Sequence, residues 1–315
     1  MKTQLGILAV LATISAPAAA GTIDLGVASN YSAFVFGDYT TNGNSVAGAL
    51  AIGGNATLAG NSIANAQHNA YGLVVGGDFN KVYGGSVNGN AWIGGNNGIT
   101  QSYSVSGHVD TASTASAPVD FAAARTQLTT LSSELSKVGA TGSYAAKDQW
   151  NQASKVFTAS GSNVEFFSLN ASEFASFNNL TFNSIAAGTT LIFNVAGESA
   201  NLGWQWQSLG SQYNVLFNFY EATSVTLNGL SLNASILAVN ATINQGSGNL
   251  NGTIVANNWN NSVTLGKGGF AAADTPLFGT AVAAVPEPSS YALLLAGMAI
   301  IGFTATRRKR TLTDK

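Results

Sequence analysis

Short β-prone runs that end in a glycine pair recur along the first third of the chain. Three of them are ALAIGGN at 49–55, GLVVGGD at 72–78 and NAWIGGN at 90–96, so their glycine pairs lie 23 and then 18 residues apart. A related rhythm returns later, where ILAVN at 236–240 is followed after 18 residues by IVANN at 254–258. Strand and turn units at such intervals are typical of a β-solenoid and not of a helical repeat.

In a solenoid of this kind, each short strand points alternate side chains inward, where Ile, Val and Leu form a continuous core. Glycine and asparagine are expected at the corners because they tolerate positive φ angles. The uneven spacing leaves a second fold open, an antiparallel β-sandwich with glycine-rich hairpins. Residues 189–195 (TTLIFNV) and 213–219 (YNVLFNF) are predicted to be buried strands.

One segment, at about 118–138, has the pattern of an amphipathic helix. Its apolar residues recur at alternating intervals of three and four, namely Phe121, Ala124, Leu128, Leu131, Leu135 and Val138. Pro118 suits the first turn, Asp120 the positive helix start, Lys137 the negative end and Gly139 the C-cap. The narrow apolar stripe predicts that this helix packs alongside the β-structure.

Residues 1–20 have the layout of a secretory signal peptide. Lys2 gives a positive start, residues 5–14 are apolar, and Ala18 to Ala20 supply the small residues that signal peptidase accepts. Gly21 is therefore the expected first residue of the exported chain, and residues 21–280 are the expected β-domain.

The C-terminal 35 residues have three parts in sequence. Residues 281–288 form a linker that ends in Pro286, Glu287 and Pro288, and residues 289–306 are uncharged. Eighteen residues of helix span about 27 Å, close to the hydrocarbon thickness of about 30 Å, so this segment is predicted to cross a membrane. In the tail at 307–315, Arg307, Arg308, Lys309 and Arg310 would hold that end on the cytoplasmic side.

Charge is sparse in this chain, at 8% of residues. Between the two hydrophobic ends there are 6 Lys or Arg and 12 Asp or Glu residues, so the net charge of the domain is −6. Nucleic acid is excluded as a partner, because phosphate binding requires clustered cations. The chain has no cysteine, which excludes thiol catalysis, cysteine-bound zinc and iron–sulfur clusters.

No catalytic residue, metal ligand or cofactor site is predicted. His68 and His108 lie in Asn-, Gly- and Ser-rich loops without a metal-binding spacing, and GESAN at 197–201 lacks the final glycine of a nucleophile elbow. Carboxylates such as Asp38 and Glu221 are scattered, whereas a glycosidase needs a pair. Calcium at turns such as 76–78 is left open.

Two tryptophans, Trp204 and Trp206, alternate in GWQWQ. On a strand both indoles would face one way, either as a platform for sugar rings or as part of the core or a cap. Trp92 and Trp259 are predicted to be core residues. Threonines do not recur at a constant interval, which disfavours the regular face that ice binding requires.

Seven blocks of the chain, in order over about residues 25–265, resemble the choice-of-anchor A family of exported bacterial proteins. They are LGVASNYSAFVFGDY, VAGALAIGGNATLAG, VDFAAARTQLTTLSSEL, TLIFNVAG, VLFNFYEATSVTLNG, LNASILAVNATIN and GNLNGTIVANN. The resemblance implies a mainly β fold, a right-handed β-solenoid like that of ice-binding proteins, with one long α-helix packed alongside. It also implies an adhesive role and brings no catalytic residues.

The C-terminal block, VPEPSSYALLLAGMAIIGFTATRRKR, resembles the PEP-CTERM sorting signal. This resemblance implies processing by an exosortase in a Gram-negative bacterium that makes exopolysaccharide, with a transient inner-membrane anchor. The expected function is therefore a non-enzymatic surface or matrix protein that adheres to exopolysaccharide or other glycans. The alternatives are a carbohydrate-active enzyme with an unrecognised site and a binder of ice or crystal surfaces.

Overall fold

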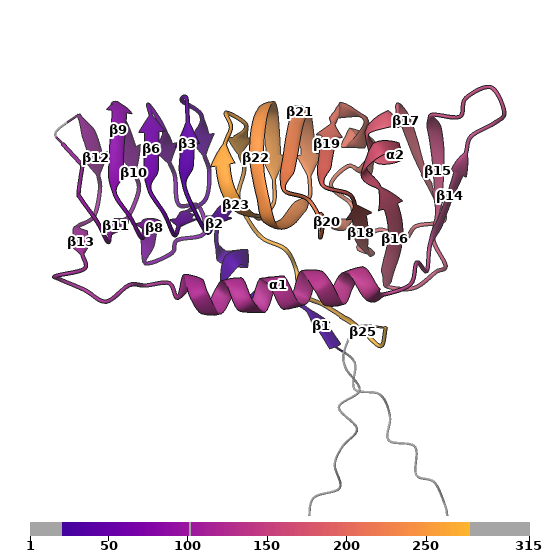
Figure 1. Ribbon diagram of the computed structural model, residues 1–315, viewed down its shortest axis with the longest axis horizontal. Coiled ribbons are helices and arrows are strands. Elements are labelled where there is room, and N and C mark those ends of the chain that lie inside the picture. The colour runs from indigo at the N-terminus through magenta and orange to yellow at the C-terminus, as the bar shows by residue number, and fades with distance from the viewer. Residues whose placement is uncertain (1–20, 101, 278–315) are drawn as a thin grey trace, which may run out of the picture. The chain divides into compact units, whose positions relative to one another are not determined.

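Parallel β-strands in three stacks make up most of the computed structural model, which describes residues 21–100 and 102–277 (Figure 1). The predicted signal peptide, sorting motif, membrane segment and basic cluster lie outside these residues. Neither helix of the described part has the length and apolar character needed to cross a membrane. The strands of the three stacks pair in parallel, which rules out the alternative of an antiparallel sandwich.

The first stack has ten members. In spatial order they are β16 (Val164–Asn170), β18 (Thr190–Ala196), β20 (Asn214–Asn218), the start of β22 (Ser235–Asn251), β23 (Ile254–Asn260), β2 (Ala33–Val35), β5 (Leu50–Ile52), β8 (Tyr71–Val75), β11 (Asn90–Ile93) and β13 (Val109–Thr111).

The second and third stacks have seven members each. The second contains β19 (Ser199–Gly203), the start of β21 (Ser224–Asn233), the middle of β22, the end of β23, β3 (Tyr39–Thr41), β6 (Ala56–Ala59) and β9 (Phe79–Tyr83). The third contains the ends of β21 and β22, then β24 (Thr264–Leu265), β4 (Ser45–Val46), β7 (Ser62–Ile63), β10 (Gly85–Val87) and β12 (Tyr103–Val105).

The order of strands in space differs from their order in the chain. β2, near the N-terminus, pairs with β5 on one side and with the late strand β23 on the other. Residues 33–111 extend the stacks in one direction, α1 (Phe121–Lys137) runs back along the first stack, and residues 164–260 return to the middle (Figure 1). The two halves of the domain are therefore joined at β2 and β23.

The stacks enclose a core of inward side chains in register. One such column of the first stack consists of Phe167, Phe193, Phe217, Ile236, Ile254, Ala33, Leu50, Leu73 and Ala91, all within the same buried cluster. The aromatic rings of its first three members stack with centroids 5.2 and 5.0 Å apart. The predicted strands at 189–195 and 213–219 correspond to β18 and β20, and Trp92 and Trp259 are buried as expected.

Helix α1 covers the outer face of the first stack. Its predicted apolar stripe is confirmed, because Ala124, Leu128, Leu131 and Leu135 are buried in one cluster with Phe34 and other outward residues of the first stack. Asp120 lies at the helix start as predicted, as the N-cap whose carboxylate accepts from the Ala123 N–H at 2.9 Å. Pro118 precedes the helix and is not in its first turn. Val138, not Gly139, is the C-cap.

A buried polar network fixes α1 to the strands beneath it. Ser132 Oγ donates to Asn218 Oδ1 at 2.6 Å, and Asn218 Nδ2 donates to the Ser132 carbonyl at 2.9 Å and to Asn194 Oδ1 at 2.8 Å. Asn194 Nδ2 in turn donates to the carbonyl of Leu135 at 2.7 Å. Buried amides are costly unless they are paired, so this network specifies one position of the helix along the stack.

The glycine pairs lie at the corner between the first and second stacks. Glycine was expected there because it tolerates a positive φ, but the structure gives a different reason. None of Gly53, Gly76 and Gly94 has a positive φ. A Cβ atom at Gly76 would clash with the carbonyl oxygen of Gly53. In the same way, a Cβ atom at Gly94 would clash with the carbonyl oxygen of Gly76. Glycine is therefore required by the close approach of neighbouring strands.

The Asn or Asp that follows each glycine pair links neighbouring strands at the same corner. Asp38 Oδ1 accepts from the Asn55 N–H at 2.8 Å, Asn55 Oδ1 from the Asp78 N–H at 2.8 Å, and Asp78 Oδ1 from the Asn96 N–H at 2.7 Å. The hydrogen bonds to Asp78 lower the pKa of its carboxyl group. The recurring GGN and GGD sequences thus satisfy one backbone donor at each corner.

A smaller sheet of β14 (Ser143–Ala146), β15 (Ser154–Thr158) and β17 (Asn179–Asn183) lies at the β16 end of the stacks (Figure 1). The backbone N–H groups of Thr141 and Gly142 both donate to the Phe166 carbonyl, at 3.0 and 3.1 Å, and so cover the edge of β16. The buried Glu165 carboxylate accepts from Thr141 Oγ1 at 2.5 Å and from the Ser162 N–H at 2.8 Å.

Burial alone would raise the pKa of Glu165, but the hydrogen bonds from Thr141, from Ser160 and from the backbone of 161–162 outweigh it and hold the pKa below its ordinary value.

The short helix α2 (Ala171–Ser176) follows β16 directly, with Asn170 as its N-cap. The first and last strands of the domain pair with each other: β1 (Gly21–Ile23) lies antiparallel to β25 (Ala273–Thr275). The 3-10 helix η1 (Gly26–Asn30) follows β1 and leads into β2.

We predict that Gly76→Ala lowers the free energy of unfolding by about 1–3 kcal/mol, because the added methyl group forces neighbouring strands apart. Gly139→Ala is the matched control, since a Cβ atom there meets nothing within 4 Å. Urea denaturation of both variants measures the difference. Equal stability of the two variants would contradict the close-approach explanation.

We predict that Glu165→Gln lowers stability at pH 7 by about 1–3 kcal/mol, since it removes the charge from a buried, hydrogen-bonded group. The folded-state pKa of Glu165 is below the ordinary value of a glutamate, so the stabilisation is complete above that ordinary value and is lost as pH falls through the folded-state pKa. The difference from wild type should therefore shrink in acid. Glu134→Gln, at a side chain 37% exposed, should change stability by about 0.5 kcal/mol or less. Thermal denaturation between pH 2 and 8 tests both expectations.

Candidate functional surface

The two tryptophans proposed as a glycan platform do not share a face. They lie on η2 (Trp204–Leu209), a 3-10 helix, and not on a strand. Trp204 is 59% exposed, whereas Trp206 is fully buried, with its ring 4.7 Å from that of Phe174 and 5.0 Å from that of Phe217. The paired platform was therefore wrong, and Trp206 has the alternative role in the core.

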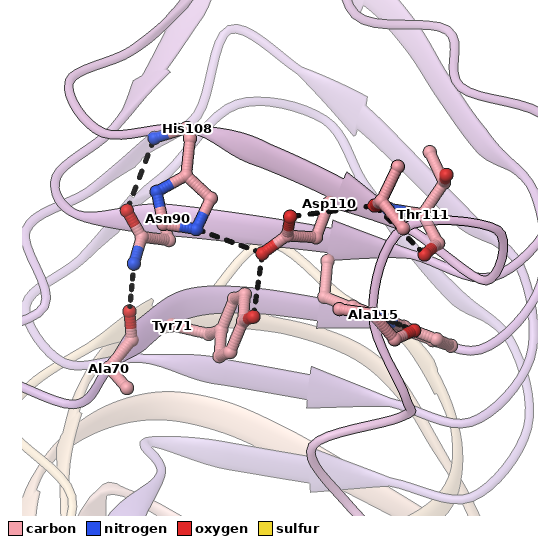
Figure 2. A network of polar contacts seen from close by, with 9 residues as sticks. Ala70, Tyr71, Asn90, His108, Asp110, Thr111 and Ala115 are labelled. Atoms are coloured by element: carbon pink, nitrogen blue, oxygen red, sulfur yellow. Dashed lines mark hydrogen bonds and ion pairs between the residues drawn. The ribbon is translucent and has the colours of Figure 1, made fainter.

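The histidine that the sequence assigned to a loop, His108, takes part in a polar network near the end of the first stack (Figure 2). His108 Nε2 lies 2.9 Å from Asp110 Oδ2, which also accepts from the Tyr71 hydroxyl at 2.6 Å. Asn90 Oδ1 accepts from the His108 N–H at 3.1 Å, while its Nδ2 donates to the Ala70 carbonyl at 2.9 Å.

One hydrogen bond, from the Tyr71 hydroxyl to Asp110, has the largest effect on the pKa values of both groups. The bond from Tyr71 lowers the pKa of Asp110, with His108 contributing less, and the same bond raises the pKa of Tyr71. Asp110 orients His108 as it would in a hydrolase, but the remaining partner is a phenol that donates to the carboxylate and not to the imidazole. The arrangement connects β8, β11 and β13, and we regard it as structural.

Within residues 21–100 and 102–277, no three His, Cys, Asp or Glu side chains are grouped so that they could hold a metal ion. His68 lies in a loop apart from the network, at an exposed position with a left-handed backbone. Asp78 belongs to the corner hydrogen bonds described above.

Two outward columns of uncharged polar side chains run along the second and third stacks. The Asn/Thr column, on the second stack, consists of Asn201, Thr226, Asn244, Asn260, Thr40, Thr57 and Asn80. The Ser column, on the third stack, consists of Ser231, Asn249, Thr264, Ser45, Ser62, Ser86 and Ser104. Sequence reasoning missed both columns, because their members are neighbours only after β23 has paired with β3 and β24 with β4.

The columns have a regular spacing that follows from the backbone. Neighbouring strands lie about 4.8 Å apart, so seven residues extend over about 29 Å. All members are exposed or half-exposed, and none is charged. Each hydroxyl or amide can both donate and accept hydrogen bonds. Such surfaces can bind a repeating, uncharged, hydrogen-bonding partner at many points.

A polar groove interrupts the middle of the Asn/Thr column. It has a volume of about 220 Å³ and is lined by segments 40–42, 245–246 and 260–262. These segments follow or belong to β3, β22 and β23, at the corner between the second and third stacks. Every lining side chain is an amide or a hydroxyl, and Gly246 contributes only backbone.

The described residues thus form a mainly parallel β-domain with one helix-covered face and two periodic columns of uncharged polar side chains. The family model described as "Putative Ice-binding-like adhesive domain" matches residues 24–270, and the chain belongs to this family. A second model, the PEP-CTERM protein-sorting motif, matches residues 284–310. No curated protein and no solved structure matches the chain.

The sorting motif defines the route of the protein although it lies outside the described residues. It marks the chain for export across the inner membrane of a Gram-negative bacterium toward the cell surface and for processing by an exosortase. Pro286, Glu287 and Pro288 and the cluster from Arg307 to Arg310 fall within the matched residues. The family match likewise supports a role in adhesion.

We predict that Trp206→Ala lowers the free energy of unfolding by about 3–5 kcal/mol, because it empties a large buried site. Trp204→Ala should change stability by about 0.5 kcal/mol or less, as expected for a surface side chain. Chemical denaturation of both variants checks this pair. Comparable losses in the two variants would contradict the separation of the two indoles into core and surface.

Proposed function

We propose that this chain is a non-enzymatic protein of the cell surface or extracellular matrix that adheres to exopolysaccharide or a related glycan in a biofilm. The observation that carries the proposal is the presence on one chain of an adhesive-domain match and an exosortase sorting motif. The family match indicates an adhesive domain. The proposal adds that the ligand is a glycan and that the chain is not an enzyme.

The uncharged columns support this function. A domain that presents 14 hydroxyl and amide side chains in two regular rows can form many weak hydrogen bonds along a polymer. Each bond contributes little alone, because it replaces a bond to water. Adhesion then depends on the number of contacts, and not on one deep pocket.

We further propose that the three stacks are the sides of a right-handed β-solenoid of the choice-of-anchor A type. The parallel pairing in all three stacks and the long helix along the first stack support this assignment. The signal peptide at 1–20 would be removed by signal peptidase, and residues 289–306 would hold the chain in the inner membrane until the exosortase acts.

The pairing of β1 with β25 supports Gly21 as the first residue of the folded domain. The first residue expected after signal-peptide removal, Gly21, is opposite Thr275 in this pair. The Thr22 hydroxyl donates to Asp274 Oδ1 at 2.6 Å, and Ile23 is fully buried.

Ice binding is a second candidate that one observation favours. Thr40 and Thr57 are neighbours in the Asn/Thr column, although they lie 17 positions apart in the chain. Asn260 and Asn244 separate them from Thr226, so the column is not a continuous row of threonines. The mixed composition supports glycan adhesion over ice binding.

We predict that replacing Pro286, Glu287 and Pro288 with alanine blocks processing, so that a longer, membrane-bound form accumulates in the host. Ser289→Ala together with Ser290→Ala is the matched control, because it changes adjacent residues outside the tripeptide. Immunoblots of membrane, surface and medium fractions measure the outcome. Normal processing and surface delivery of the alanine triple variant would contradict the sorting role.

A further inference from the structure

The polar groove has a floor that is held in place by a buried side chain. Asn261 is 4% exposed, and its Nδ2 donates to the Gln245 carbonyl at 2.9 Å. Its Oδ1 accepts from the Val263 N–H at 2.8 Å. One buried amide therefore connects β22 to the chain after β23 and fixes the groove walls at 245–246 and 260–262 relative to each other.

Gln245, in the wall formed by β22, has an unusual backbone. Its φ is +36°, in the left-handed region that glycine usually occupies, and its side chain is exposed. Only four non-glycine residues of the described chain have a positive φ: Asn65, His68, Ser184 and Gln245. Gln245 is the extra residue of a β-bulge, because Thr226 pairs with Asn244 and Leu227 with Gly246. Its exposed side chain lines the groove and is a candidate contact for a ligand.

The side chains around the groove are free to bind a ligand. In the described part of the chain, no hydrogen bond within the protein uses the side chain of Thr40, Asn42, Gln245, Asn260 or Ser262. Asn42, Gln245, Asn260 and Ser262 are exposed, and Thr40 is half-exposed. Their amides and hydroxyls converge on the groove from three segments that are far apart in sequence.

The chemistry of these groups selects a class of ligand. An apolar ligand would displace water from these donors and acceptors and leave them unpaired, which costs free energy. An anionic ligand would find no cation among the lining residues, in a domain whose net charge is −6. A neutral, polyhydroxylated ligand matches the uncharged amide and hydroxyl groups, since it too both donates and accepts.

We propose that the groove binds a sugar residue of a neutral polysaccharide, with the rest of the polymer along the Asn/Thr column. The column continues on both sides of the groove, through Asn244 on β22 and Thr57 on β6. This inference rests on the proposed adhesive function and names its site and its ligand class. Gln245 and Asn260 are the residues that contact the sugar.

The test uses the full chain, purified in detergent, and measures its retention by four neutral polysaccharides: dextran, amorphous cellulose, galactan and mannan. Alginate, which is acidic, is the charge control. We expect retention by at least one neutral polymer and none by alginate. Gln245→Gly and Asn260→Ala should each weaken binding by about tenfold, corresponding to one hydrogen bond to the ligand.

Ser184→Gly is the matched control for Gln245→Gly, because it also replaces a non-glycine residue with a left-handed backbone, at φ +57°, but outside the groove. It should bind as wild type does. Binding that is unchanged in Gln245→Gly and Asn260→Ala, or equally reduced in Ser184→Gly, would overturn the groove assignment while neutral-glycan adhesion stands. Retention by alginate alone would overturn the ligand class.

Failure of the inference and failure of the proposed function are distinguishable. If the chain binds none of the four polymers but cells that express it still attach to the host exopolysaccharide, the groove assignment is wrong and adhesion remains. If the cells also fail to attach, both are wrong. Shaping of ice crystals without retention by any glycan would assign the surface to ice and overturn the proposal.

Discussion

The pairing of β2 with β23 is the contact on which the rest of the domain depends. It places Phe34 beside Val255 and joins strands that are more than 200 residues apart in the chain. The inward columns of the two halves become one core only through this joint, and the Tyr39 and Trp259 rings, 5.6 Å apart and nearly parallel, extend it into the second stack. The polar groove also forms here, because its walls come from both halves.

Three physical devices keep the stacks in register. Glycines at the first corner allow backbones to approach closely, and the Asn or Asp side chains after them satisfy backbone donors of the neighbouring strand. The buried network of Ser132, Asn194 and Asn218 sets the position of α1 along the stack. With one outer face covered by this helix, the two remaining faces are left for a partner, and their uncharged columns suit a neutral polymer.

Much of the fold could be predicted from local patterns, since these patterns report local causes. The stripe from Ala124 to Leu135 predicted the buried face of the helix, and Trp92 and Trp259 were correctly placed in the core. The shared platform of Trp204 and Trp206 was wrong because it assumed a strand, whereas the chain forms a 3-10 helix that buries only the second indole. The alternative of a core role is confirmed for Trp206. Ser132 was missed because a polar residue on a helix is ordinarily exposed.

The sequence by itself determined the mainly β character, the helix and its apolar face, the sparsely charged surface and the sorting motif. Each of these depends on composition or on residues close together in the chain. Only the tertiary structure decided which strands are neighbours, because a late strand pairs with an early one and the order in space differs from the order in sequence. The two polar columns and the groove at Gln245 follow from that pairing, since segments 40–42 and 260–262 meet only when β3 lies beside β23.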